Sequence, residues 1–212
     1  MEVERVKIEW LGHATFKIGD EKIIYTDPYQ IGSGEPADII LITHSHFDHC
    51  SPEDIQKIIK KGTVLFVTPD CQSKVSNFED IEIKLVEPDK TYEADGVRIE
   101  TLPAYNLKPE RLKFHPKENE WVGYVITVNG KKIYHAGDTD LIPEMKNLQN
   151  IGIALLPIGG TYTMDVEEAA EAANLIRPKT VVPMHYNKVE GTEADPEEFK
   201  QKVSNNINVK IL

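Results

Sequence analysis

Short apolar runs bounded by turn-forming residues recur along the chain and predict strands with helices between them. In the first half we expect a β-hairpin, a strand that leads into a histidine-rich segment, a helix with Ser51 as its N-cap, and one more strand. The predicted ranges are 8–18 and 22–25 for the hairpin, 38–43 for the strand, the segment between Ser51 and Gly62 for the helix, and 63–68 for the last strand.

The second half repeats this order of elements, and Asn129-Gly130 is typical of a tight hairpin turn. Asp165 and Glu168 form a predicted N-cap pair for the second helix. The predicted ranges are 121–128 and 131–134 for the hairpin, 151–156 for a strand, 166–176 for the helix and 180–184 for a strand. Identical residues also lie 111 positions apart in the two halves: Trp10 and Trp121, Gly12 and Gly123, Asp27 and Asp138.

Two similar sheet-and-helix halves predict one architecture. Each sheet must bury a face, and stacking the sheets with helices on the outer faces satisfies both halves. We therefore expect an α/β protein with a four-layer αββα sandwich, folded as a single domain over residues 1–212. Between the halves lie predicted strands over 81–85 and 97–102 and a polar stretch over 105–120, which we interpret as a functional loop.

Composition narrows the class of protein. The chain has 40% hydrophobic and 28% charged residues, and no apolar run approaches the ~18 residues that a membrane span requires. The first residues lack the order of a secretory signal, and Cys50 and Cys71 are too few for a disulfide framework, so we expect a cytoplasmic protein without membrane partners. The net charge of −11 disfavours nucleic acid as a partner, while the sequence leaves a homo-oligomer open.

Candidate metal ligands gather where predicted strands end. Four of them lie in one short segment directly after a strand, and two more follow strands of the second half. Imidazoles together with carboxylates suit zinc, manganese or iron, and mixed sets are typical of catalytic sites that keep a coordination position open. We predict a site for one or two divalent ions. The six candidate ligands are His44, His46, Asp48, His49, Asp138 and His185.

These motifs carry a family resemblance over nearly the whole chain. The HxHxDH run, a later Gly-Asp-Thr and a Pro-Met-His after a strand resemble the metallo-β-lactamase superfamily. Three further segments resemble the branch of ascorbate-6-phosphate lactonase and N-acyl-phosphatidylethanolamine phospholipase D; they are 10–16, 26–28 and 156–164. The resemblance is specific for the fold and the metal site, and it is weak for the substrate, because one fold serves many reactions.

The resemblance implies a division of the ligands. It places His44 and His46 on one metal, and Asp138 between the two metals. The ligands implied for the other metal are Asp48, His49 and His185.

One position departs from the family pattern. Related chains commonly have Pro-Ala-x-His where this chain has Asn106, whose neutral oxygen is a poorer zinc ligand than imidazole. Three consequences are open: a weak or empty first site, a harder ion such as manganese, or His115 entering from the loop.

Other residues near the motifs allow two interpretations each. For His13 we favour a packed, hydrogen-bonded histidine over a substrate contact. Asp27 either orients a metal-bound histidine or simply forms an Asp-Pro turn. Four basic residues of the polar stretch could attract an anionic substrate, although a solvated loop is the commoner explanation; they are Lys108, Arg111, Lys113 and Lys117.

The leading hypothesis is a metal-dependent hydrolase. A metal-bound hydroxide would attack the substrate, with Asp48 as the catalytic residue that holds the metal and the attacking water in line. We expect a small anionic ester as substrate, either a phosphodiester or a sugar-phosphate lactone. Two alternatives stay open: a metal-binding regulatory or scaffold protein of the same fold without turnover, which Asn106 motivates, and a nuclease of the same fold.

Overall fold

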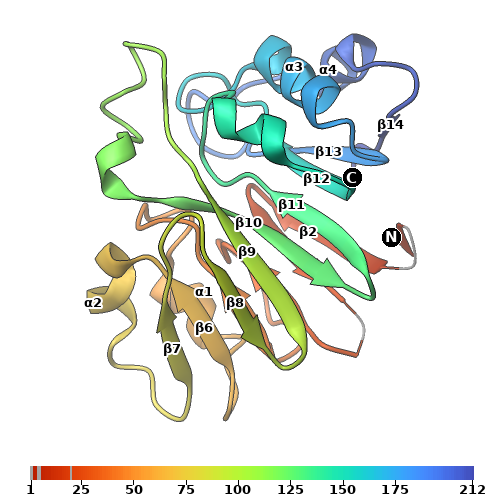
Figure 1. The fold of residues 1–212 in the computed structure, drawn as a ribbon. Helices are drawn as coiled ribbons and strands as arrows, with labels where there is room; N and C mark the ends of the chain where they lie inside the picture. The colour runs from red at the N-terminus through yellow and green to blue at the C-terminus, as the bar shows by residue number, and fades with distance from the viewer. Residues whose placement is uncertain (1, 4–5, 20) are drawn as a thin grey trace.

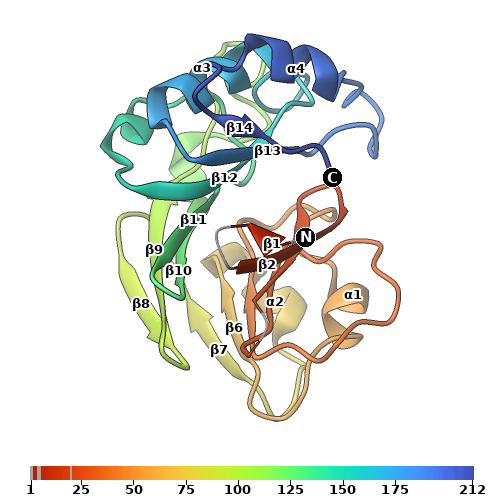
Figure 2. The same ribbon diagram turned by 90° about the vertical axis from the view of Figure 1, so that its right-hand side faces the viewer.

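Two β-sheets pack face to face in the computed structural model, which describes residues 2–3, 6–19 and 21–212 (Figures 1 and 2). The first sheet has seven strands in sequence order: β1 (Glu2–Val3), β2 (Val6–Gly12), β3 (Thr15–Ile18), β4 (Ile24–Thr26), β5 (Ile39–Leu41), β6 (Val64–Val67) and β7 (Glu82–Leu85). The second sheet also follows sequence order: β8 (Thr91–Ala94), β9 (Val97–Pro103), β10 (Val122–Val128), β11 (Lys131–His135), β12 (Ile151–Pro157), β13 (Thr180–Met184) and β14 (Asn208–Val209).

The two sheets share one pairing scheme. Neighbouring strands from β1 to β4 and from β8 to β11 are antiparallel. Those from β4 to β7 and from β11 to β14 are parallel. This correspondence bears out the expectation that the two halves follow one plan.

Helices cover the outer faces of both sheets and complete the expected four-layer αββα sandwich (Figures 1 and 2). The α-helices are α1 (Pro52–Gln56), α2 (Gln72–Val75), α3 (Val166–Ile176) and α4 (Pro196–Lys202). The 3₁₀ turns are η1 (Pro69–Cys71), η2 (Lys117–Asn119) and η3 (Pro143–Asn147). No helix in the described ranges is long and apolar enough to cross a membrane.

Successive side chains of a strand face opposite sides of the sheet, and this alternation explains the layers. In β5, Ile39 and Leu41 face the core between the sheets, whereas Ile40 faces the opposite way and packs with Ile55 of α1 and Val75 of α2. Successive side chains of a strand point to opposite faces, so an unbroken apolar strand needs cover on both sides. The thin layer of α1 and α2 supplies that cover.

Most predicted elements are confirmed, including the N-caps. Ser51 caps α1 through its side chain, and Asp165 forms a capping box with Glu168 at α3. The first predicted helix is much shorter than expected, because α1 ends at Gln56 and the chain continues to Gly62 in turns. Two helices of the structure, α2 and α4, were not expected from the sequence.

The predicted strand over 8–18 is wrong, because the chain reverses within it. Gly12 has a φ of +106° and His13 a φ of +53°, so both adopt the left-handed conformation that closes a turn between β2 and β3. The two tryptophans 111 positions apart are therefore not equivalent, since Trp10 lies on β2 and Trp121 precedes β10. Asp27 and Asp138 are equivalent, because they follow β4 and β11.

Candidate metal centre

The candidate ligands converge at one edge of the two packed sheets. Asp27 and His44 follow the parallel neighbours β4 and β5, while Asp138 and His185 follow β11 and β13. The carboxyl ends of parallel strands meet at one edge, where open α/β sheets commonly bind ligands. The halves are joined there by backbone bonds: the Val122 N–H donates to the Thr43 carbonyl (3.2 Å) and the His185 N–H to the His13 carbonyl (3.0 Å).

Two groups of four side chains could each hold a metal ion, and in each group the ligand atoms lie within 4.8 Å of one another. The first cluster consists of His44, His46, His115 and Asp138. The Asp138 Oδ2 lies 3.2 Å from the His115 Nε2 and 3.9 Å from the His44 Nε2. The His46 Nδ1 lies 3.0 Å from the His44 Nε2. The second cluster consists of His13, Asp48, His49 and His185.

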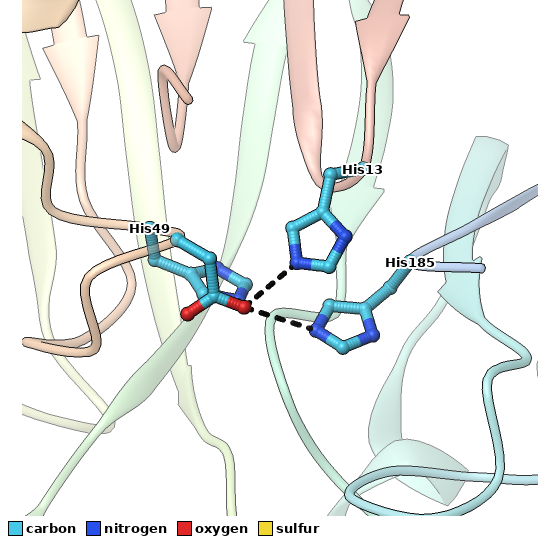
Figure 3. A group of neighbouring side chains, drawn as sticks. His13, His49 and His185 are labelled. Carbon is cyan, nitrogen blue, oxygen red and sulfur yellow. Dashed lines mark hydrogen bonds and ion pairs between the residues drawn. The ribbon is translucent and has the colours of Figure 1, made fainter. Parts of the chain in front are cut away.

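The second cluster brings together residues from three separate segments (Figure 3). The Asp48 Oδ2 lies 2.9 Å from the His13 Nε2, 3.7 Å from the His49 Nε2 and 3.9 Å from the His185 Nε2. Asp138 of the first cluster also reaches this group, with Oδ1 3.3 Å from the His49 Nε2 and Oδ2 3.0 Å from the His185 Nε2. Asp138 therefore lies between the clusters, where the resemblance implied a bridging carboxylate.

Two histidines of the second cluster depend on unusual backbone conformations. His13 and His185 have φ values of +53° and +55°, in the left-handed region that non-glycine residues seldom adopt. Their rings lie side by side, with centroids 3.9 Å apart (Figure 3). The backbone strain at both positions accompanies side chains that turn into the cluster, as is common at functional sites.

Burial and mutual charge set the protonation states of these groups. Burial lowers the pKa of His13 and His46 to about 4, and it lowers the pKa of His44 well below its usual value. Burial would also lower the pKa of His49, but nearby carboxylates, Asp138 foremost, raise it well above its usual value. Burial would raise the pKa of Asp138, but His185 and His49 lower it well below its usual value.

Several ligand atoms are buried without a hydrogen-bond partner. They are the Nε2 atoms of His49, His115 and His185 and the Oδ1 of Asp138. The Asp138 carboxylate lies 3.3 Å from the His49 Nε2, 3.2 Å from the His115 Nε2 and 3.0 Å from the His185 Nε2, yet these atoms form no hydrogen bond, although buried polar groups are nearly always satisfied. A divalent cation between imidazole nitrogens and carboxylate oxygens would satisfy these atoms, so the residues fit a metal site.

Asn106 does not join the first cluster. Its Oδ1 accepts a hydrogen bond from the His115 Nδ1 (2.9 Å), and its Nδ2 donates to the Asp140 Oδ1 (3.1 Å) and the Tyr162 carbonyl (3.0 Å). His115 instead reaches the cluster from the polar stretch over 105–120, with its other ring nitrogen toward Asp138. Of the three consequences considered for Asn106, the geometry matches the entry of His115.

Asp140 organises this polar stretch and was not singled out from the sequence. Its carboxylate accepts hydrogen bonds from the Leu107 N–H (2.7 Å), the Lys108 N–H (3.0 Å) and Arg111 (2.8 Å), besides that from Asn106. The sequence signal was its place two positions after Asp138, at the end of the same strand. Asp140 fixes the path of the chain toward His115.

Asp27 contacts a cluster histidine, in accord with one of its two interpretations. The His49 Nδ1 lies 2.8 Å from the Asp27 Oδ2, and the Thr43 N–H donates to Asp27 Oδ1 (2.8 Å). The Thr43 hydroxyl donates to the Asp27 Oδ2 (2.7 Å) and lies 2.9 Å from the His44 Nδ1. Such contacts to the second ring nitrogen orient ligand histidines.

Three of the four basic residues of the polar stretch pair with carboxylates, so these three are not free to draw an anion to the site. Arg111 is buried and pairs with Asp140 and Glu168 at 2.8 and 2.7 Å. Lys108 pairs with Glu168 (2.9 Å) and Lys117 with Glu144 (3.2 Å). The remaining one, Lys113, lies over the ring of Phe114.

A cleft of about 210 Å³ opens onto both clusters. Its base contains members of each cluster, and its walls carry apolar and aromatic side chains. No lysine or arginine of the described ranges lines it. The lining residues are His46, Phe47, Asp48, Phe114, His115, Asp138, Tyr162, His185 and Val189.

Comparison with known proteins places this chain in a family. Residues 7–185 match the model of the Beta-lactamase superfamily domain. A relative from Pyrococcus abyssi, named UPF0173 metal-dependent hydrolase, is 37% identical over 98% of this chain and 96% of its own. The chain belongs to the metallo-β-lactamase superfamily and to its UPF0173 metal-dependent hydrolase family.

Solved structures agree with this membership of the metallo-β-lactamase superfamily. A protein of Parabacteroides distasonis is 34% identical and superposes with a TM-score of 0.87, covering 100% of this chain and 96% of its own. The structure titled Igni18, a novel metallo hydrolase from Ignicoccus hospitalis, is 31% identical with a TM-score of 0.81, covering 98% and 94%. The segment matched by the superfamily contains every residue of the two clusters, from His13 to His185.

Proposed function

We propose that this chain is a single-domain hydrolase that cleaves a small anionic ester with the help of one or two divalent ions, zinc, manganese or iron. The main support for this proposal is the pair of clusters at one cleft, where buried imidazole nitrogens lack hydrogen-bond partners. The lowered pKa values of His44, His46 and Asp138 favour neutral imidazoles and an ionised carboxylate, which are the forms that bind cations.

Each cluster has a defined part in this proposal. His44, His46 and His115 would hold one ion, and the second cluster would hold the other, with Asp138 between them. When bound, a divalent cation acts as a Lewis acid and lowers the pKa of a coordinated water molecule toward about 7. Asp48 is the catalytic residue: its carboxylate lines the cleft and contacts His13, and His49 and His13 hold its pKa below the usual value against the effect of burial, so it stays ionised and can orient a water molecule toward the ester.

The lining of the cleft favours a phosphodiester over a sugar-phosphate lactone. A separate phosphate group needs cationic or N–H donors, and no basic side chain of the described residues lines the walls. A phosphodiester carries its single charge on the reacting group itself, where the ions and not the walls would balance it.

The test is metal content and turnover measured on the same preparations. By elemental analysis we expect one or two divalent ions per chain. We also expect hydrolysis of bis(4-nitrophenyl) phosphate that a chelator abolishes and added metal restores. Asp48→Ala should lose at least about 10³-fold in kcat, whereas Asp195→Ala, at the N-cap of α4, should retain activity.

Two results would overturn the proposal. Full activity of Asp48→Ala or of the chelated protein would refute metal-dependent hydrolysis. Bound ions without turnover across phosphodiesters, lactones and carboxylic esters would identify a metal-binding protein of the same fold. Asn106 is the residue that favours this alternative, but the His115 Nε2 lies beside Asp138, at 3.2 Å from its Oδ2.

A further inference from the structure

Phe47 is the most exposed of the large hydrophobic side chains described, with 63% of its surface accessible. It lies between His46 and Asp48, one member of each cluster, so its backbone is fixed by the site. Its ring meets the edge of Tyr29, with centroids 5.8 Å apart. An exposed aromatic side chain that lines a cleft and packs edge-on against a second ring is suited to contact an apolar group.

The facing walls of the cleft are also apolar. Phe114 is half-buried beside His115 and packs edge-on against Tyr162, with ring centroids 4.8 Å apart. Val189 lines the cleft from the loop that follows His185. Phe47 and Phe114 thus adjoin members of the clusters in sequence, and a group that touches both rings would lie in the cleft that members of both clusters line.

The charged side chains that line the cleft disfavour a second anionic group at these walls. The only charged side chains that line the cleft within the described residues are Asp48 and Asp138, both acidic, besides the histidines. Of the basic residues of the polar stretch, Arg111 and Lys117 are paired with carboxylates, and the Lys113 Nζ lies 4.7 Å from the centroid of the Phe114 ring. An anion placed against Phe47 would lose its hydration without a compensating partner.

The volume of the cleft limits the size of the substituent that can bind against its walls. A cavity of roughly 150 Å³ accommodates benzene in another protein, so the cleft of about 210 Å³ has room for one ring and the ester group beside it.

Resting on the proposed function, we propose that the apolar walls formed by Phe47, Phe114, Tyr162 and Val189 are a substrate subsite. The subsite takes one uncharged, apolar substituent of the ester, a single aromatic ring or a short alkyl group. The anionic reacting group lies at the two clusters, and the walls select the substituent. The substrate is therefore a small phosphodiester with an apolar substituent and no charged one.

Binding of two phosphonates tests the subsite without turnover. Calorimetry on the metal-loaded protein should give a dissociation constant about tenfold or more lower for phenylphosphonate than for methylphosphonate, because the phenyl group buries apolar surface against the walls. Phe47→Ala and Val189→Ala should each reduce this ratio, and Phe47→Leu should keep most of it. Val189 lies outside the segment from His44 to His49, so its replacement leaves the cluster residues of that segment unchanged.

The control variant is Leu112→Ala, which removes an exposed apolar side chain of the same polar stretch outside the cleft and should leave the ratio unchanged. Equal affinity for the two phosphonates, binding of neither, or an unchanged ratio in both Phe47→Ala and Val189→Ala would overturn the subsite. Hydrolysis of phosphodiesters without any preference for an apolar over a charged substituent would refute the subsite and keep the proposed function. Phenyl preference without hydrolysis of any ester would refute the proposed function alone.

Discussion

Replacing Asn106 with alanine tests how His115 is held in the first cluster. The asparagine side chain is almost completely buried and forms three hydrogen bonds, to the His115 Nδ1, to Asp140 and to the Tyr162 carbonyl. Removal of this side chain takes one hydrogen-bond acceptor from the His115 ring. It also takes one hydrogen bond each from the Asp140 carboxylate and the Tyr162 carbonyl. Groups that orient a ligand histidine in this way are typically worth ~10–100-fold in metal affinity.

The surrounding contacts bring the expected effect of Asn106→Ala to the lower end of this range. His115 keeps a second acceptor, the Tyr162 carbonyl at 3.1 Å from its Nδ1. Asp140 keeps its bonds from Arg111 and two backbone N–H groups, so its charge stays paired. We therefore expect about tenfold weaker binding of one ion, which corresponds to about 1.4 kcal/mol.

The assay is competition with a metal chelator, combined with the number of ions retained after dialysis. Asn106→Ala should lose one ion at a lower chelator concentration and keep the ion of the second cluster, which serves as an internal control. The matched variant is Asn174→Ala, since Asn174 also bridges two segments through its side chain but lies near the C-terminal end of α3. Retention of both ions at unchanged affinity in Asn106→Ala would refute the positioning of His115 by Asn106.

Two further predictions concern stability. The free energy of unfolding of the chelator-stripped protein should fall as the pH falls from about 6.5 toward 4, because burial holds the folded-state pKa of His46 at about 4 and the unfolded chain takes up the proton first. The raised pKa of His49 acts in the opposite sense, because the stability that it contributes is lost as the pH rises. Thermal unfolding against pH checks this, and a melting temperature that rises on acidification would contradict it. Gly123→Ala should lower the free energy of unfolding, measured with urea, by ~1–3 kcal/mol, because the added Cβ would lie 2.7 Å from the Ala136 carbonyl oxygen. The control is Gly32→Ala, whose Cβ would meet nothing within 4 Å and should change the stability little. Equal stability of the two variants would contradict this explanation.

The ligand segments could be predicted from the sequence because each is a local pattern. An apolar strand followed by polar ligands identifies both the strand and the edge where it ends, and this holds for His44, Asp138 and His185. The repeated order of elements likewise predicted two similar sheets, since each sheet must bury a face whatever its neighbour.

The sequence could not specify contacts between segments distant along the chain. Asn106 occupies the place of a family ligand, yet the bonds of Asp140 and Tyr162 turn it away and bring His115 in. His13 was expected to be a packed, hydrogen-bonded residue, and its bond to Asp48 places it in a cluster as well. Sequence distance carries no information on such pairs.

The sequence by itself determined the strands, the two-sheet plan and the ligand types, because these follow from local periodicity and residue chemistry. Only the tertiary structure decided where the chain reverses at His13, which charges of the loop are already paired, and which histidine faces Asp138. These outcomes depend on the packing of one half against the other. A buried charge or imidazole is placed by the partners that the whole fold brings to it.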